Sequence, residues 1–91
     1  MKLNKTFGLF ENFLNKNFFI DSRDVREDSV FICIKGLNDD GHKYIKPVLN
    51  NYKKTIIICE KKSKYSYIYK KNQRVLICQS TKYFMKDLAL I

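Results

Sequence analysis

Side chains suited to binding a polar ligand are concentrated between residues 20 and 42. Ser22 offers a hydroxyl, and Asn38 offers an amide that can pair with the edge of a base. Gly36 lets backbone N–H groups approach a ligand closely. The same stretch holds the single histidine of the chain, His42. These residue types point to recognition of a polar ligand.

A catalytic constellation is absent from the sequence. His42 has no serine or cysteine partner at a recognised spacing, so we expect it to be a cap or a surface side chain. Asp39 and Asp40 are adjacent and would not share a face of a helix or strand, and turn formation with N-capping explains them. Neither GxxxxGK[ST] nor GxGxxG occurs. We therefore predict no catalytic residue in this chain.

The three cysteines, Cys33, Cys59 and Cys78, each lie within an apolar run. Their number is odd and none belongs to a CxxC pair, which argues against a disulfide framework and against a zinc site. We predict buried, reduced thiols that pack as small hydrophobic side chains, and no metal site.

The elements that must position the polar stretch alternate along the chain. Apolar runs predict a short edge strand at 18–20 and buried strands at 30–34, 55–59 and 74–78. Helices are predicted at 3–14, at 42–51 and after Ser80 or Thr81. This order indicates an α/β fold, a small sheet with parallel central strands flanked by helices. Ligands of such sheets bind beyond the carboxyl ends of the strands, so we expect Ser22 and the loop 36–41 to form one crevice.

Two helix boundaries can be refined. Asp39 or Asp40 is a suitable N-cap for the helix at 42–51, but Pro47 is tolerated only near a helix start, so regular helix should begin nearer 44. In the last helix, one side is predicted to consist of Tyr83, Phe84, Leu88 and Ile91. Residues 60–73 are predicted to form a loop with a poorly defined short element.

Length and composition indicate a single domain over residues 1–91 with one modest core. No run of 18 apolar residues could span a membrane, and the N-terminus lacks the apolar region of a signal peptide, so we expect a cytoplasmic protein. The net charge is +9. Since the excess comes from 15 scattered lysines against 3 arginines, we expect a solvated basic surface and regard nucleic acid as an unlikely partner.

Several segments together resemble the N-terminal domain of the Mur ligases. These segments are Asp21-Ser22-Arg23, Val30-Phe31-Ile32-Cys33-Ile34-Lys35-Gly36 and Asp40-Gly41-His42-Lys43-Tyr44-Ile45. They are similar to the family's DSR, LFVAIKG and DGHxFI, and the strand at 55–60 and the segment 75–90 also fit. One departure is the family's proline-glycine-aspartate turn, which here is Glu27-Asp28-Ser29.

The resemblance implies that this domain binds the UDP end of UDP-MurNAc-peptide. By position, Ser22 and Ile20 would contact the uridine, and Leu37, Asn38 and Asp39 would close on it. The most similar type is the ligase that adds the third residue to UDP-MurNAc-L-Ala-D-Glu, with the D-Ala-D-Ala-adding type as the alternative.

In the family, ATP and Mg²⁺ are handled by central and C-terminal domains that are absent from this chain. The chain alone is therefore expected to bind without catalysis, and the remaining domains of the parent ligase would be its partners.

Two further functions compete with this interpretation. A small basic nucleic-acid-binding module would use Lys61 to Lys71, with single-stranded bases stacked on Tyr65, Tyr67 and Tyr69. A protein-interaction domain is suggested by the apolar end of the chain.

Overall fold

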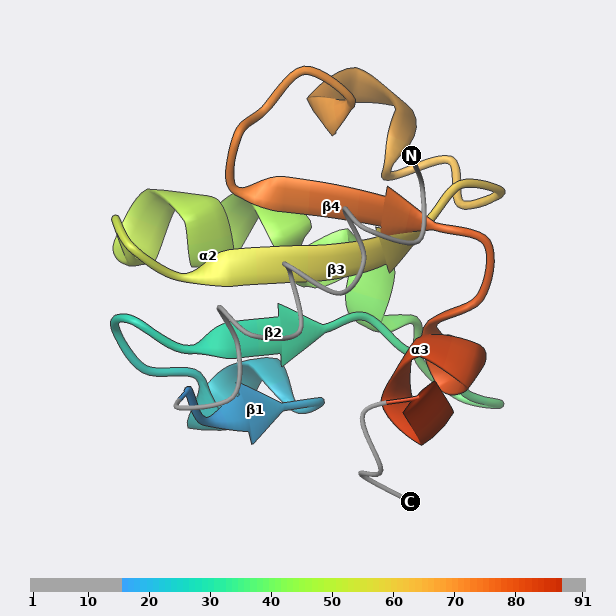
Figure 1. Cartoon of the computed structure of the whole chain (residues 1–91), viewed down its shortest axis with the longest axis horizontal. Coiled ribbons are helices and arrows are strands. Elements are labelled where there is room, and N and C mark those ends of the chain that lie inside the picture. The colour runs from blue at the N-terminus through green and yellow to red at the C-terminus, as the bar shows by residue number, and fades with distance from the viewer. Residues whose placement is uncertain (1–15, 88–91) are drawn as a thin grey trace.

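The described residues, 16–87 of the computed structural model, contain one sheet of four parallel strands in the order β1-β2-β3-β4 (Figure 1). The strands are β1 (Phe18–Phe19), β2 (Val30–Ile32), β3 (Ile56–Glu60) and β4 (Val75–Cys78). The α-helices are α2 (Ile45–Asn51) and α3 (Thr81–Asp87), and short 3-10 helices are η1 (Ser22–Asp24), η2 (Gly41–Tyr44) and η3 (Tyr67–Tyr69). The predicted α/β fold with a parallel sheet is confirmed. The helix predicted at 3–14 lies outside the described residues.

The sheet is covered on both faces, as its continuous apolar strands predict. Side chains alternate, so that Phe31 and Ile57 point to one face and Ile32 and Ile58 to the other. On the first face they pack against α2, and on the second against Phe84 and Met85 of α3. All residues of β2 are fully buried. The core therefore lies in two layers, one on each side of the sheet.

Hydrogen bonds lock the amino ends of the strands. Glu27 accepts from the backbone N–H groups of Lys53, at 3.1 Å, and Lys54, at 2.6 Å. The Thr55 hydroxyl donates to the Arg26 carbonyl at 2.8 Å. The chain before β2 is thus fixed to the chain before β3.

Arg74 fixes the end of α2 at the same side of the sheet. Its guanidinium donates to the carbonyls of Leu49 at 2.9 Å, Thr55 at 3.2 Å and Tyr52. Leu49 and Tyr52 lie in and just beyond the last turn of α2, where carbonyls have no partner within the helix. Arg74 therefore caps the carboxyl end of α2 from a distant part of the sequence. These hydrogen bonds hold the amino ends of the strands, so a ligand-binding site is expected at the opposite edge, where the strands have their carboxyl ends.

Some predicted boundaries were shifted. Strand β2 ends at Ile32 rather than at residue 34, β3 runs from Ile56 to Glu60 rather than over 55–59, and the stretch 42–51 divides into η2 and α2. The α-helix begins at Ile45, which places Pro47 in its first turn, as predicted.

The last helix differs in the side that it buries. Phe84 and Met85 pack against the sheet, whereas Tyr83 is 70% exposed. Tyr83 and Phe84, which were predicted to share one side of this helix, therefore differ in burial, and Leu88 and Ile91 lie outside the described residues. The Ser80 hydroxyl accepts from the N–H of Tyr83 at 3.3 Å, so Ser80 serves as the predicted cap.

Candidate functional site

A polar cavity of about 720 Å³ lies beyond the carboxyl ends of β1 and β2. We call it the Ser22 cavity. Its lining comes from the segment after β1, the end of β2 and the loop that leads into η2, and consists of Ile20, Asp21, Ser22, Arg23, Ile34, Gly36, Asp39, Gly41 and Tyr44. This volume is in the range of small-molecule sites. The position matches the crevice expected from the sequence.

Asp21 and Arg23 shape one wall of the Ser22 cavity. Asp21 caps η1 by accepting from the Arg23 backbone N–H at 2.9 Å, and its carboxylate also accepts from the Arg23 guanidinium at 2.7 and 3.1 Å. The side-chain hydrogen bond from Arg23 is the main reason that the pKa of Asp21 is lowered to about 2. Asp21 is therefore a charged, structural carboxylate near neutral pH.

The Ser22 hydroxyl forms no hydrogen bond with any other described residue, although its carbonyl accepts from Val25 N–H at 3.4 Å. The side chains of Ile20, 55% exposed, and Ile34 supply apolar surface in the same cavity. A free hydroxyl beside two aliphatic side chains suits a flat, partly polar ligand such as a nucleobase.

Of the three predicted contact residues in the loop 36–41, one lines the Ser22 cavity and two do not. Asp39 lines the cavity, but its carboxylate is already paired with Lys43 at 2.6 Å and with the Tyr44 hydroxyl at 2.8 Å. These two hydrogen bonds lower the pKa of Asp39. Leu37 is fully exposed and Asn38 is exposed, and neither lines the cavity. The structure thus brings Ile20, Ser22 and Asp39 together and leaves Leu37 and Asn38 at the loop tip.

Gly36 and Gly41, the two glycines of this loop, have different structural roles. The N–H of Gly36 donates to the Asp39 carbonyl at 2.8 Å, so it closes the turn instead of facing a ligand as we expected. Gly41 is the position of close approach. A Cβ atom there would lie 3.0 Å from the nitrogen and 3.2 Å from the oxygen of Ile34. Gly41 therefore lets the chain entering η2 pass directly against the end of β2.

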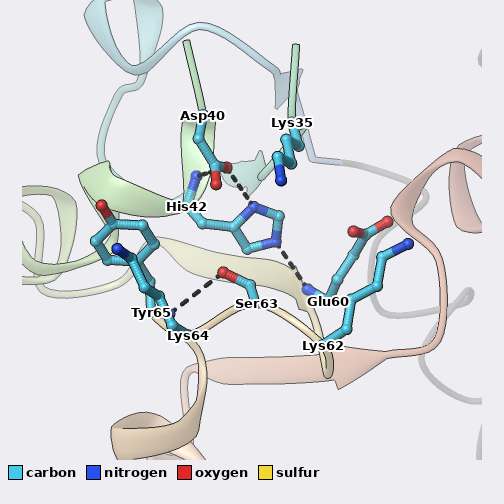
Figure 2. Close-up of a pocket in the computed structure, with 8 residues that line it drawn as sticks. All are labelled: Lys35, Asp40, His42, Glu60, Lys62, Ser63, Lys64 and Tyr65. Carbon is cyan, nitrogen blue, oxygen red and sulfur yellow. Dashed lines mark hydrogen bonds and ion pairs between the residues drawn. The ribbon is translucent and has the colours of Figure 1, made fainter. Parts of the chain in front are cut away.

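A second cavity, of about 530 Å³, lies at the carboxyl ends of β2 and β3 (Figure 2). We call it the Lys35 cavity. Residues on three segments line it: Lys35 after β2, Asp40 and His42 at the start of η2, and Glu60, Lys62, Ser63, Lys64 and Tyr65 at the end of β3 and beyond. It contains three lysines and two carboxylates, so its lining is close to electrically balanced.

His42 forms the floor of the Lys35 cavity and is 1% exposed, so the expectation of a surface side chain was wrong. Its Nε2 accepts from the Glu60 backbone N–H at 2.9 Å, which places the ring proton on Nδ1. Nδ1–H then donates to the Asp40 carboxylate at 2.8 Å. Both ring nitrogens are occupied, so His42 joins two strand ends and is not available as a base.

Asp40 also accepts from the backbone N–H of His42 at 3.0 Å and is the N-cap of η2. Burial by itself would raise the pKa of Asp40, but the hydrogen bonds from His42 outweigh it and the pKa is lowered. The capping role predicted for Asp40 is confirmed, because its carboxylate accepts from the backbone N–H of His42 at this helix start.

Glu60 extends the same network and was not singled out in the sequence. Its carboxylate accepts from the Thr81 backbone N–H at 3.0 Å and from the Thr81 hydroxyl at 3.2 Å. Glu60 is 9% exposed, so these bonds form in a largely water-excluded setting. The available signal was a charged residue directly after the apolar run 55–59, but its partner lies 21 residues further along the chain.

The cysteines are free thiols, with Cys33 and Cys59 buried and Cys78 half-buried. Burial is the main cause that raises the pKa of each, to about 11 for Cys78. They are neutral packing side chains, as predicted. Within residues 16–87, no three His, Cys, Asp or Glu side chains are grouped so that they could hold a metal ion. No helix within the same residues is long and apolar enough to cross a membrane.

A parallel α/β sheet with a polar cavity beyond its strand ends is an arrangement typical of ligand-binding domains. Three curated proteins similar to the chain are UDP-N-acetylmuramoyl-L-alanyl-D-glutamate–2,6-diaminopimelate ligases. Those of Clostridium botulinum, Rickettsia prowazekii and Clostridioides difficile are 51%, 46% and 46% identical over 41, 43 and 44 residues. These matches cover 45–48% of this chain and 8–9% of the relatives.

The fold is also similar to that of a solved structure, the MurF ligase from Thermotoga maritima in complex with ADP. The TM-score is 0.70 at 31% identity, and the match covers 86% of this chain and 17% of the MurF chain. No protein-family model matches the chain. In sequence and in fold, the chain is thus related to the Mur ligases, and it spans a small fraction of the length of these relatives.

Proposed function

We propose that this chain binds the uridine diphosphate end of UDP-MurNAc-peptide, as the N-terminal domain of an ATP-dependent ligase of peptidoglycan precursors. The observation that carries the proposal is the Ser22 cavity. There the Ser22 hydroxyl, which has no partner among the described residues, and two isoleucine side chains meet beyond the strand ends. The diaminopimelate-adding relatives act, by their names, on a UDP-linked muramoyl dipeptide.

The proposed binding mode divides the ligand between apolar and polar contacts. Ile20 and Ile34 pack against the faces of the uracil ring, and the Ser22 hydroxyl hydrogen-bonds to the edge of the base or to the ribose. Asn38 and Leu37 stand at an exposed loop tip with no other described partner for the amide, so a small movement of the loop brings them over the ligand. Asp39 contributes mainly by holding this loop to Tyr44.

We further infer that ATP and Mg²⁺ act outside these 91 residues. The sequence has no GxxxxGK[ST] loop to hold the phosphates of ATP, and Asp40 and Glu60 are occupied by backbone N–H groups. The chain supplies binding and orientation of the nucleotide. The intact enzyme would activate the substrate carboxylate as an acyl phosphate, which an amine then attacks.

Calorimetric titration of the folded chain with UDP-MurNAc-L-Ala-D-Glu, UDP and ADP tests the proposal. We expect both uridine ligands to bind with similar affinity, because the peptide lies outside the cavity, and ADP to bind at least tenfold more weakly. Ser22→Ala should weaken UDP binding about 5- to 10-fold, the effect of one hydrogen bond.

Ser63→Ala is the matched control, because it makes the same change in the Lys35 cavity and should leave UDP binding unaltered. A folded chain that binds neither uridine ligand at millimolar concentration would refute the proposal. Equal weakening by Ser22→Ala and Ser63→Ala would place the ligand elsewhere.

A further inference from the structure

The connection between β3 and β4 carries a concentrated positive charge. Residues 61–71, which we call the basic loop, contain five exposed lysines and no acidic residue. In Figure 1 it arches beyond β4, the sheet edge opposite β1, with η3 at its centre. Among the described residues, no carboxylate forms an ion pair with any of these lysines. This charge is available to a partner.

The basic loop has a defined conformation, in which two of its tyrosines pack against the core and the third is exposed. Tyr65 and Tyr69 pack against the hydrophobic core, so they anchor the loop. Backbone hydrogen bonds from Ser66 N–H to the Ser63 carbonyl and from Tyr69 N–H to the Ser66 carbonyl, at 3.1 and 3.0 Å, tighten the turns between them. The anchoring leaves Tyr67 and Ile68 at the outside, 68% and 74% exposed.

We propose that the basic loop docks the chain on an anionic lipid bilayer. The lysines suit the negative surface of such a membrane, and the exposed pair Tyr67 and Ile68 suits the boundary between headgroups and acyl chains. An amphipathic tyrosine beside an aliphatic residue is typical of this boundary. The inference stands independently of the uridine site, which lies at the other end of the sheet order, beyond β1 and β2.

The structure favours lipid over single-stranded nucleic acid. Base stacking needs free aromatic faces, but Tyr65 and Tyr69 are half-buried and pack against the core. The ammonium of Lys70 lies 4.7 Å from the ring centroid of Tyr67 and covers one face of that remaining tyrosine. Arginine, which reads phosphates and bases in a bidentate manner, is absent from the basic loop. An exposed isoleucine also has no function in a phosphate-binding surface.

Vesicle co-sedimentation of the 91-residue chain tests the proposal. We expect binding to vesicles of phosphatidylcholine with about 40% phosphatidylglycerol and none to phosphatidylcholine alone. Lys70→Gln/Lys71→Gln should raise the lipid concentration for half-binding on the order of tenfold or more, since each lysine near an anionic surface contributes about fivefold. Ile68→Ser should weaken binding a few-fold without changing the charge, a result that pure electrostatic attraction does not produce.

Lys82→Gln/Lys86→Gln is the control, because it removes two exposed lysines from α3, which packs on the opposite face of the sheet. It should have less than half the effect of the basic-loop pair on a logarithmic scale, and circular dichroism should show every variant folded. The proposal is overturned if anionic vesicles are not bound, if the two lysine pairs act equally, or if Ile68→Ser has no effect. It is also overturned if a fluorescent oligothymidine binds more tightly than the vesicles and loses affinity in the same loop variants.

Discussion

Glu60 and His42 connect segments that meet only at the carboxyl edge of the sheet. His42 accepts the N–H of Glu60 and donates to Asp40, and the Glu60 carboxylate in turn accepts the N–H and hydroxyl of Thr81 at the start of α3. A carboxylate at a helix N-terminus also interacts favourably with the helix dipole. One buried network therefore holds η2, β3 and α3 in place beside both cavities.

Removing the charge of Glu60 should destabilise the protein. Glu60→Gln keeps the side-chain shape but weakens two hydrogen bonds to Thr81, and we expect the free energy of unfolding to fall by about 1–2 kcal/mol. Urea denaturation measures the change. Asp24→Asn removes an exposed carboxylate instead and should stay within about 0.5 kcal/mol of the unchanged protein. Similar values for the two variants would contradict the structural role of Glu60.

The loops that enter β2 and η2 each depend on the backbone conformation or size of one residue, Asp28 and Gly41. Asp28 has a φ of 59°, in the left-handed region, two residues before the fully buried strand β2. It occupies the place where the family turn has glycine, which adopts this conformation without strain. Its carboxylate pairs with Lys16 at 2.7 Å, and this hydrogen bond lowers the pKa of Asp28. The ion pair is exposed, so backbone conformation is the larger requirement here.

Two substitutions at position 28 separate these contributions. Asp28→Asn and Asp28→Val both remove the charge, but asparagine tolerates the left-handed region and a β-branched side chain does not. We expect Asp28→Val to be less stable than Asp28→Asn by about 1–2 kcal/mol in urea denaturation. If the two variants were equally stable, the turn would not require a positive φ.

Gly41 should be less tolerant of alanine than Gly36. A Cβ at position 41 meets two backbone atoms of Ile34 at 3.0 and 3.2 Å, whereas at position 36 it meets a single carbonyl oxygen at 3.3 Å. We expect Gly41→Ala to lower the free energy of unfolding by about 1–3 kcal/mol, and Gly36→Ala by less. Because Gly41 lines the Ser22 cavity, Gly41→Ala should also weaken UDP binding, and equal unfolding curves for the two variants would disprove the close approach.

For the molecule as a whole, lowered carboxyl pKa values set the response to acid. A folded-state pKa below the unfolded value gives stability that is complete above the unfolded value and is lost as the pH falls through the folded one. The groups concerned act at both ends of the sheet, through hydrogen bonds to cations or to backbone N–H groups. They are Asp21, Glu27, Asp28, Asp39 and Asp40.

Stability should therefore be nearly constant from pH 7 to 5 and should decline from about pH 4 towards pH 2, where Asp21 titrates. Protonation also increases the net charge beyond +9, so self-repulsion acts in the same direction. Thermal unfolding followed by circular dichroism at pH 7, 5, 4, 3 and 2 measures this profile. A melting temperature that rises below pH 4 would show that these carboxylates are not stabilised by their partners.

The α/β class, the parallel sheet and the location of the crevice could all be predicted from the sequence. Apolar runs such as 30–34, and the loop marked by Gly36 and Gly41, are signals contained in short stretches of sequence. Because parallel strands have their carboxyl ends at the same edge of the sheet, the position of the crevice follows from the order of these elements. Resemblance of the DSR and DGH segments to the Mur ligases added the expected ligand. The capping role of Asp40 could also be predicted from the sequence, because the cap residue directly precedes the helix that it caps.

Which polar groups already have hydrogen-bond partners became clear from the folded structure alone. His42 is buried because Glu60 N–H and Asp40 reach both of its ring nitrogens, and Arg74 caps a helix 25 residues before it. These partners are distant in the sequence, and no periodicity encodes them. Contacts between distant or neighbouring side chains also decide which residues of the Ser22 cavity are available to a ligand. Asp39 is tied to Lys43 and Tyr44, while the Ser22 hydroxyl has no partner among residues 16–87 and becomes the group on which the proposed uridine site depends.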